Sequence, residues 1–571
     1  MERLRFVAVL AVLAMLAACT SSTSDTTAGA GEDVSTTVEG GTGSEGDEGS
    51  EGEGEGPTGM LISAAPTLAG AGQDPLIATA FSHKVYWDEI HDYLIEQEPN
   101  GNLVGALAES WEASEDQLTW TFKIREGVLF HNGDELTAED VAWSLDRSTF
   151  DPESASGLSS RAQAIDSIEA VDTYTVEVTT LAPQATLPTW FGKHDGGSAA
   201  TIYSKAHYES VGDEAWQSQP MGTGPYEFVS YEREQSADLT AFLDPNRNDW
   251  QISRTPHYKD LRVIAVPDAS TRVALLRTGE VDLAPIPISS AEQLVDAEGV
   301  ALIDVEAGTQ STMFCIGYTF NPESPCDDQR VREALSIAID RQAIADGLYQ
   351  GFAQPAAAYM AGPGAFGNPE DLEPPPYDPE RAEQLLSEAG YDASNPLEIV
   401  IMASDIPGDF EMMPTLAESI AGYYDQIGVV ASLRIEEEEA YKDALFEFQL
   451  PGHPGLPAEP ATLWMRGVDN RWYFVDEQLS GFSSLGRSGA AVYNEEVYPD
   501  IRQRLDEVSA EFDFDLQAEK FAEFHRWMAG EWNQIQLLVG DAVYGASDKV
   551  GSWDQRIAGK AYAHNHWSIA P

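Results

Sequence analysis

Helical and extended periodicities alternate between Arg330 and Ile435. The segment Arg330–Arg341 has apolar residues at i, i+3, i+4, i+7 and i+8, which predicts a helix with one buried stripe: Val331, Ala334, Leu335, Ala338 and Ile339. Four further segments continue in the order helix, strand, helix, strand: RAEQLLSEAGY with Gly390 as its C-cap, Leu397–Met402, Thr415–Ile427 ended by Gly428, and Val429–Ile435. Such alternation implies an α/β fold with a largely parallel sheet.

A different unit occupies Leu107 to Arg147. Its centre alternates apolar and polar residues, the pattern of a half-buried strand, with the apolar positions at Leu118, Trp120, Phe122 and Ile124. Asn132-Gly133 then supplies a turn that tolerates positive φ. Thr137 is followed three residues later by Asp140, as in a capping box. The unit is therefore predicted to be a strand, a turn and a capped helix.

This unit closely resembles the signature region of the extracellular solute-binding proteins of peptide-type ABC transporters (the peptide/nickel type, family 5). The matching residues are Leu107–Glu112, Phe122–Val128, Phe130–Gly133 and Thr137–Arg147. Three later segments resemble the same family: Gly222–Tyr226 (GTGPY), Thr271–Leu283, and the helix Arg330–Arg341. The GTGPY segment, with its two glycines and neighbouring prolines, is predicted to be a turn that leads into a strand. It is not a phosphate loop, because no Lys follows it.

The resemblance implies an α/β, two-lobed periplasmic-binding-protein-like fold of type II, in the large cluster that has an extra subdomain in lobe I. About 510 residues follow the N-terminal segment, which agrees with more than one core. The expected boundaries are 59–308 for lobe I with an inserted subdomain at about 100–215, 309–540 for lobe II, and 541–571 for a C-terminal return to lobe I.

The N-terminus predicts export and anchoring. Arg3 and Arg5 precede an apolar run, Phe6–Leu16, which is shorter than the roughly 20 residues that span a membrane. The run ends in Leu-Ala-Ala-Cys19, which resembles a bacterial lipobox and implies a lipoprotein signal peptide at 1–18 and a lipid on Cys19. Residues 19–58 are acidic and lack Lys and Arg, so they are expected to form a disordered tether. A cation-binding tail is the alternative.

The formal net charge of −64 excludes some classes of partner. Nucleic-acid binders need a basic surface, and docking on anionic lipid by charge needs one too. A strongly acidic surface keeps a protein soluble at high salt, where charge repulsion is screened. A marine or halotolerant bacterial source is therefore our hypothesis.

The candidate ligand site is the long Gly- and Pro-rich stretch Phe446–Gly489, because long irregular segments in compact proteins are usually functional. Trp and Tyr offer flat apolar walls, Arg can clamp a carboxylate, and Asp469 could face an amine. The candidate residues are Trp464, Arg466, Asp469, Arg471, Trp472 and Tyr473. The alternative is a surface loop with ordinary packing aromatics.

Cysteine and histidine usage leaves two further questions. After Cys19 only Cys315 and Cys326 remain, and they could form a disulfide in an exported protein or stay as two buried thiols. His453 and the pair His564/His566 raise the possibility of a metal, but no third ligand is evident nearby, so no metal and no cofactor are expected.

The resemblance implies a substrate-binding lipoprotein that captures an oligopeptide or dipeptide and docks, as a monomer, on the permease subunits of an ABC importer. A non-peptide solute (an oligosaccharide, opine or metal chelate) on the same fold is one alternative, and a sensor or chaperone role is another. A secreted carboxylate-based hydrolase is a third, although the sequence contains no HExxH or GxSxG motif. We therefore expect that the protein is not an enzyme.

Overall fold

The computed structural model describes residues 57–68, 84–97, 103–152, 154, 157–192, 200–216, 218–243, 256–295, 297–315, 324–358, 366–405, 412–437, 461–469, 499–532, 534–553 and 567–569. The chain separates into two units, Met1–Gly54 and Glu55–Pro571, and every described residue belongs to the second. The expected signal peptide, Cys19 and nearly all of the acidic tether lie outside the described residues.

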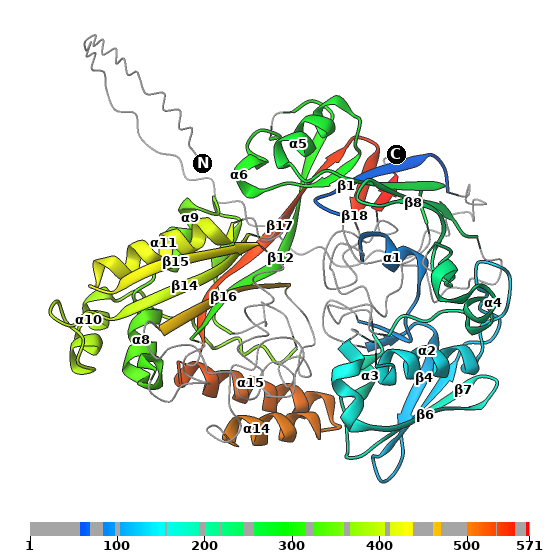
Figure 1. Ribbon diagram of the computed structural model, residues 1–571, viewed down its shortest axis with the longest axis horizontal. Coiled ribbons are helices and arrows are strands. Elements are labelled where there is room, and N and C mark those ends of the chain that lie inside the picture. Colours follow the sequence, from blue (N-terminus) through cyan, green and yellow to red (C-terminus); the bar gives the residue numbers. More distant parts are fainter. Residues whose placement is uncertain are drawn as a thin grey trace, which may run out of the picture. The chain divides into compact units, whose positions relative to one another are not determined.

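One eleven-stranded sheet organises the second unit (Figure 1). Its strands, in spatial order, are β15 (Val430–Glu437), β14 (Glu398–Asp405), β16 (Ala461–Asp469), β12 (Val300–Cys315), β17 (Ile535–Ser547), β11 (Leu283–Pro285), β1 (Met60–Ala65), β10 (Asp260–Ala265), β9 (Ser236–Ala241) and β8 (Tyr226–Glu232), with β13 (Ala353–Pro355) paired to β17.

The sheet is mixed, and so only part of the predicted parallel arrangement is correct. Strand β14 runs parallel to both β15 and β16, as the alternation of helices and strands predicts. Strand β12, however, is antiparallel to both β16 and β17. Strand β12 precedes the segment 330–435 in which helices and strands alternate, and β17 follows it. No crossover helix therefore forces either strand to run parallel to its neighbours.

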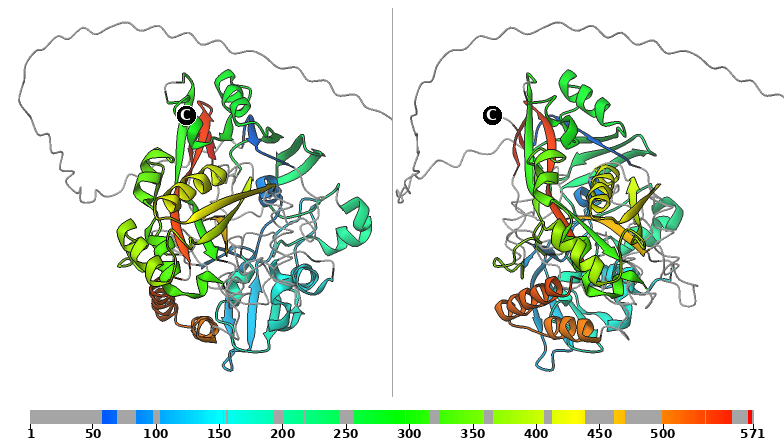
Figure 2. Two further views of the ribbon diagram at one scale, coloured as in Figure 1. Left: turned by 60° about the vertical axis from the view of Figure 1, so that its left-hand side comes forward. Right: turned by 90° about the vertical axis from the view of Figure 1, so that its left-hand side faces the viewer.

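Strands β12 and β17 run side by side along their length (Figures 1 and 2). Residues 536–539 and 542–544 belong to the single strand β17, because its pairing with β12 continues through both segments. The pairing is irregular at one place: Val305 faces Ala542 and Thr309 faces Gly540, so three residues of β12 stand opposite Asp541. The expected lobe boundaries, 308/309 and 540/541, fall at this irregularity.

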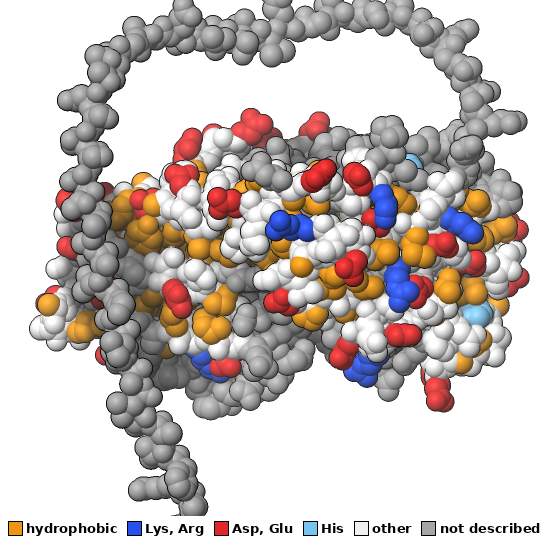
Figure 3. All heavy atoms as spheres, turned by 90° about the horizontal axis from the view of Figure 1, so that it is seen from above, with side chains coloured by type: hydrophobic (Ala, Val, Ile, Leu, Met, Phe, Trp, Pro, Cys, Tyr) orange, Lys and Arg blue, Asp and Glu red, His pale blue; other side chains and the backbone are white. Residues whose placement is uncertain are grey.

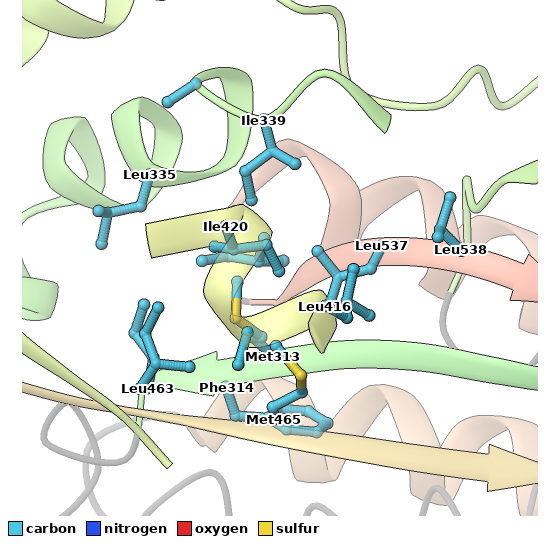
Figure 4. Packing of buried hydrophobic residues seen from close by; sticks show 14 of the residues in the cluster. Met313, Phe314, Leu335, Ile339, Leu416, Ile420, Leu463, Met465, Leu537 and Leu538 are labelled. Atoms are coloured by element: carbon cyan, nitrogen blue, oxygen red, sulfur yellow. The ribbon is translucent and has the colours of Figure 1, made fainter. Parts of the chain in front are cut away.

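A large hydrophobic core lies mainly between Met313 and Val543 (Figure 4). Most of its helical residues come from α8 (Gln329–Ile337), α9 (Arg341–Gly347), α10 (Pro379–Glu388), α11 (Met413–Gln426), α14 (Pro499–Ser509) and α15 (Phe514–Gly530). All five residues of the predicted stripe on Arg330–Arg341 are buried, which confirms the periodicity. The predicted helix is too long, because α8 ends at Ile337 and the Asp340 carboxylate caps a new helix by accepting from the Ala343 amide.

A separate subdomain core lies between Tyr93 and Ile202. Its four-stranded antiparallel sheet has the order β4 (Ala108–Ala113), β5 (Thr119–Ile124), β7 (Thr175–Thr180), β6 (Ile165–Asp172). The predicted strand, turn and helix are confirmed: Trp120, Phe122 and Ile124 of β5 are buried, and Gly133 has a φ of +87°. The strand is one position shorter than predicted, because Leu118 lies before it and is half-buried. Helix α2 (Ala138–Phe150) begins with a capping box between Thr137 and Asp140.

The remaining described elements complete the second unit. They are α1 (Lys84–Ile90), β2 (Ile95–Gln97), β3 (Leu103–Gly105), η2 (Gly157–Ala164), α3 (Leu187–Trp190), α4 (Lys205–Trp216), α5 (Ala269–Thr278), α6 (Ile288–Ala291), η4 (Pro325–Asp327), β18 (Val550–Trp553) and β19 (Trp567–Ile569).

Candidate functional site

The first three predicted ligand residues belong to a strand and not to an irregular loop. Trp464, Arg466 and Asp469 lie on β16, where they pair in register with Phe314, Thr312 and Thr309 of β12. The signal that could have found the strand is its own alternation. Leu463 and Met465 are buried in the large core, and positions 464 and 466 belong to the other period-two set. The Gly- and Pro-rich flanks masked this pattern.

Strand β16 leads to the irregular part of the β12–β17 pair. Its last residue, Asp469, is in register with Thr309, which in turn faces Gly540 of β17. The predicted site strand therefore ends beside the place where β12 and β17 pass from one core to the other. Arg471, Trp472 and Tyr473 lie outside the described residues, so the structure brings only the backbone positions of Trp464, Arg466 and Asp469 onto one element.

The GTGPY segment packs against the end of α1. Gly222 and Gly224 allow the close approach, because a Cβ on either would lie 2.1–2.6 Å from the carbonyl oxygen of Ile90. The Gly224 amide also donates to that oxygen over 2.8 Å. The segment continues into β8, so the prediction of a turn followed by a strand is confirmed.

A buried polar cluster next to this turn was not predicted. Glu89, His91 and Asp92 all have side chains that are fully buried. The Thr223 hydroxyl donates to Asp92 Oδ2 over 2.8 Å, and His91 Nδ1 lies 3.3 Å from the Ile202 carbonyl oxygen. The run EIHDY contains mostly polar side chains, which local patterns place on a surface. Packing against the turn and against Ile202 and Tyr203 buries them.

Burial decides what this cluster can do chemically. Desolvation, followed by the nearby charge of His131, lowers the pKa of His91 to about 3. The imidazole is therefore neutral near pH 7, and its Nδ1 is the atom placed to donate to the Ile202 oxygen. A group with such a pKa holds its neighbours in position but is poorly matched to proton transfer at neutral pH.

The described residues contain no group of three or more His, Cys, Asp or Glu side chains that could hold a metal ion. His453, His564 and His566 lie outside them. Cys326 is buried in η4 and is disulfide-bonded, while the side chain of Cys315, at the end of β12, is not among those described. Within the described ranges, no helix is both long and apolar enough to cross a membrane.

Comparison with known proteins identifies relatives over most of the chain. Residues 102–465 match the family model described as "Bacterial extracellular solute-binding proteins, family 5 Middle". Heme-binding protein A of Haemophilus influenzae is 30% identical over 447 residues, which cover 73% of this chain and 76% of that protein. Glutathione-binding protein GsiB of Pectobacterium atrosepticum is 32% identical over 290 residues, which cover 51% of this chain and 53% of that protein.

The fold is also similar to solved structures. The periplasmic binding protein DppA of Helicobacter pylori, associated with an ABC transporter and solved with the peptide STSA, superimposes with a TM-score of 0.73 at 22% identity. The match covers 90% of this chain and 98% of that one. The α/β architecture described above is therefore that of the two-lobed periplasmic binding proteins.

Proposed function

The chain belongs to the bacterial extracellular solute-binding proteins of family 5, and we propose that its cargo is an oligopeptide or dipeptide. Members of this family bind solutes outside the cytoplasm and work with the permeases of ABC transporters, so the chain is a binding protein and not an enzyme. The observation that carries the peptide proposal is the similarity, over 90% of this chain, to a binding protein that holds a peptide.

We place the ligand against β16. Arg466 or Arg471 would clamp a carboxylate of the cargo with its planar guanidinium, and Asp469 would pair with an amine. Trp464, Trp472 and Tyr473 would supply apolar walls with a polar edge. The support for this placement is the register of Asp469 with Thr309, beside the irregular part of the β12–β17 pair.

The lobes would then follow the expected boundaries, 59–308 with the subdomain, 309–540, and 541–571. A cargo bound between them favours closure to the extent that it contacts the closed state better than the open state. Lobes that are joined by strands close by a hinge motion, in which a few backbone dihedral angles change. The three-residue irregularity in β12 is a suitable place for such a change.

Lipid attachment at Cys19 would hold the protein at the outer face of the membrane, with residues 19–58 as the tether. Expression of the full chain and of Cys19→Ser in a bacterial host, followed by detergent-phase partitioning, tests this. The wild type should enter the detergent phase and the variant should stay in the aqueous phase. Equal partitioning would contradict the anchor.

We also propose that Cys315 is the disulfide partner of Cys326. Cys315 is the last residue of β12, Cys326 lies in η4, and only a short segment of chain separates them. Alkylation of the denatured protein without reductant should label neither cysteine. Cys315→Ser should release one reactive thiol at position 326. A labelled Cys326 in the wild type would contradict the pair.

Native mass spectrometry of the protein as purified, followed by denaturing release of what it carries, tests the cargo. A set of short peptides is the expected result. A single non-peptide solute would overturn the peptide assignment and leave the family unchanged. Haem is the second candidate, because the relative named for haem binding matches 73% of this chain. A Soret band in the absorbance spectrum after addition of hemin would favour it.

A further inference from the structure

The subdomain and the α14–α15 hairpin touch, although they belong to different cores. Trp120 of β5 stacks on Phe512, with ring centroids 5.8 Å apart and planes at 13°. The Ala185 amide donates to the Ser509 carbonyl oxygen over 2.9 Å. We propose that these two contacts form a latch that holds the two lobes together independently of the ligand. This proposal rests on the two-lobed fold and on lobe closure, and not on the identity of the cargo.

The subdomain side of the latch is built around one peptide unit. The Trp120 indole Nε1 donates to the Gln184 carbonyl oxygen over 2.9 Å. The amide of the same peptide unit, that of Ala185, is the group that donates to Ser509. The Trp120 side chain is 7% exposed, so its ring is held by the subdomain core and presents one face to Phe512. Hydrogen bonds on both sides of one peptide polarise each other.

The hairpin side is equally ordered. The buried Gln517 side chain donates through Nε2 to the carbonyl oxygens of Val508 and Glu511, each over 3.1 Å. Lys520 Nζ lies 2.6 Å from Glu511 Oε2. The Asp513 carboxylate caps α15 by accepting from the Leu516 amide. The turn that carries Phe512 is therefore fixed before it meets Trp120, which keeps the entropic cost of the contact low.

The two sides belong to parts of the molecule that have separate cores. Helices α14 and α15 bury Ile501, Leu505 and Phe521 in the large core, whereas Trp120 lies in the subdomain core. Figures 1 and 2 both show the α14–α15 hairpin (orange) beside the subdomain (cyan). Rotation of the lobes about the β12–β17 pair must break the stack and the hydrogen bond together. The latch would thus set the population of the open state when no ligand is bound.

Hydrogen exchange at the Ala185 amide measures the latch directly. Pro183 and Pro188 carry no amide hydrogen, so a peptide over 183–188 reports on the four amides between them. Phe512→Ala in the full chain should accelerate this exchange by about 2- to 10-fold, the range that one aromatic pair contributes to an equilibrium. The matched control is Phe514→Ala, because Phe514 is 39% exposed and its ring packs, at a centroid distance of 4.6 Å, on Phe366 of the large core and not on the subdomain.

Two results would overturn the latch. Unchanged exchange at Ala185 in Phe512→Ala is the first. The second is an equal acceleration in α15 amides such as those of Phe521 to Met528, which would mean that Phe512 only stabilises the hairpin. Small-angle scattering of the ligand-free proteins gives an independent readout, and Phe512→Ala should have a larger radius of gyration than Phe514→Ala. Neither measurement needs the cargo, so a failed peptide assignment would leave them interpretable.

Discussion

Lys549 Nζ lies 2.9 Å from the Oδ1 atom of Asp282, a carboxylate that is 1% exposed. The same carboxylate accepts from the Ser547 hydroxyl and from the Ile62 amide, each over 3.0 Å. One buried charge thus joins the residue before β11, the end of β17 and strand β1. These segments are far apart in the chain, and they meet where the C-terminal strand returns to the N-terminal part of the sheet.

Asp282→Asn should therefore destabilise the protein by about 2–4 kcal/mol, because a buried acceptor of three donors loses its charge and presents an amide hydrogen to one of them. Lys549→Ala is the matched control. Its side chain is 58% exposed, and Asp282 keeps the Ile62 amide and the Ser547 hydroxyl as donors, so removal of the Lys549 side chain should cost less than Asp282→Asn. Urea unfolding measures both values, and equal losses would contradict this account.

Two buried histidines should make the protein sensitive to acid. Burial lowers the pKa of both His91 and His525 to about 3. Below about pH 6.5 the unfolded chain binds protons that the folded chain does not, so stability is complete above that pH and falls as the pH drops towards 3. Each histidine contributes a slope of about 1.4 kcal/mol per pH unit. His525→Phe, which keeps the contacts with Phe521 and Phe524, should remove about half of this combined slope.

Chemical unfolding at several pH values between about 4.5 and 7.5 measures that slope. The variant and the wild type should diverge only below about pH 6.5. A slope that is the same in both proteins would mean that His525 gains its proton in the folded state.

Gly224→Ala should strongly destabilise the turn beside α1. The added Cβ would lie 2.4 Å from the Ile90 carbonyl carbon and 2.5 Å from the Glu89 carbonyl oxygen, which are backbone atoms that cannot move aside cheaply. A loss of about 1–3 kcal/mol is expected. Gly422→Ala is the control. Gly422 lies in α11, and among the described residues no atom outside the local helix backbone lies within 4 Å of its Cβ position, so the variant should gain about 0.5–1 kcal/mol. Thermal unfolding of both variants decides the comparison.

Arg466→Ala should weaken binding of a short peptide by about 10- to 100-fold, since a charge-assisted pair with a carboxylate contributes about 1.5–3 kcal/mol. Arg434→Ala on β15 is the control, because Arg434 pairs with Glu436 over 2.5 Å and its side chain is 47% exposed. Isothermal titration with the peptides released from the purified protein gives both affinities. An unchanged affinity in Arg466→Ala would mean that a residue other than Arg466 binds the carboxylate of the peptide.

Added salt should raise the unfolding temperature. The formal net charge is −64, and carboxylates outnumber basic side chains on the face shown in Figure 3. Salt screens the repulsion between these carboxylates. The repulsion raises the free energy of the compact state more than that of the unfolded state, so screening stabilises the folded protein. Scans from about 0.05 to 1 M potassium chloride measure the effect. A midpoint that does not move would remove the case for a high-salt habitat.

Local chemistry was sufficient wherever an element's form depends on neighbours in the chain. The capping box at Thr137, the turn at Gly133 and the buried stripe from Val331 to Ile339 were all readable from the sequence, because hydrogen bonds and periodicities within a few residues produce them. The family could be recognised for the same reason, since its motifs are continuous segments.

Tertiary packing decided the rest. Strand β16 exists because β14 and β12 lie on either side of it, and β17 is one strand because β12 supplies partners along its length. Glu89, His91 and Asp92 are buried where the Gly222–Gly224 turn and residues 202–203 pack against them. The contact of Trp120 with Phe512 joins residues nearly four hundred positions apart. No local pattern encodes such contacts, since their free energy comes from surfaces that meet only once the chain has folded.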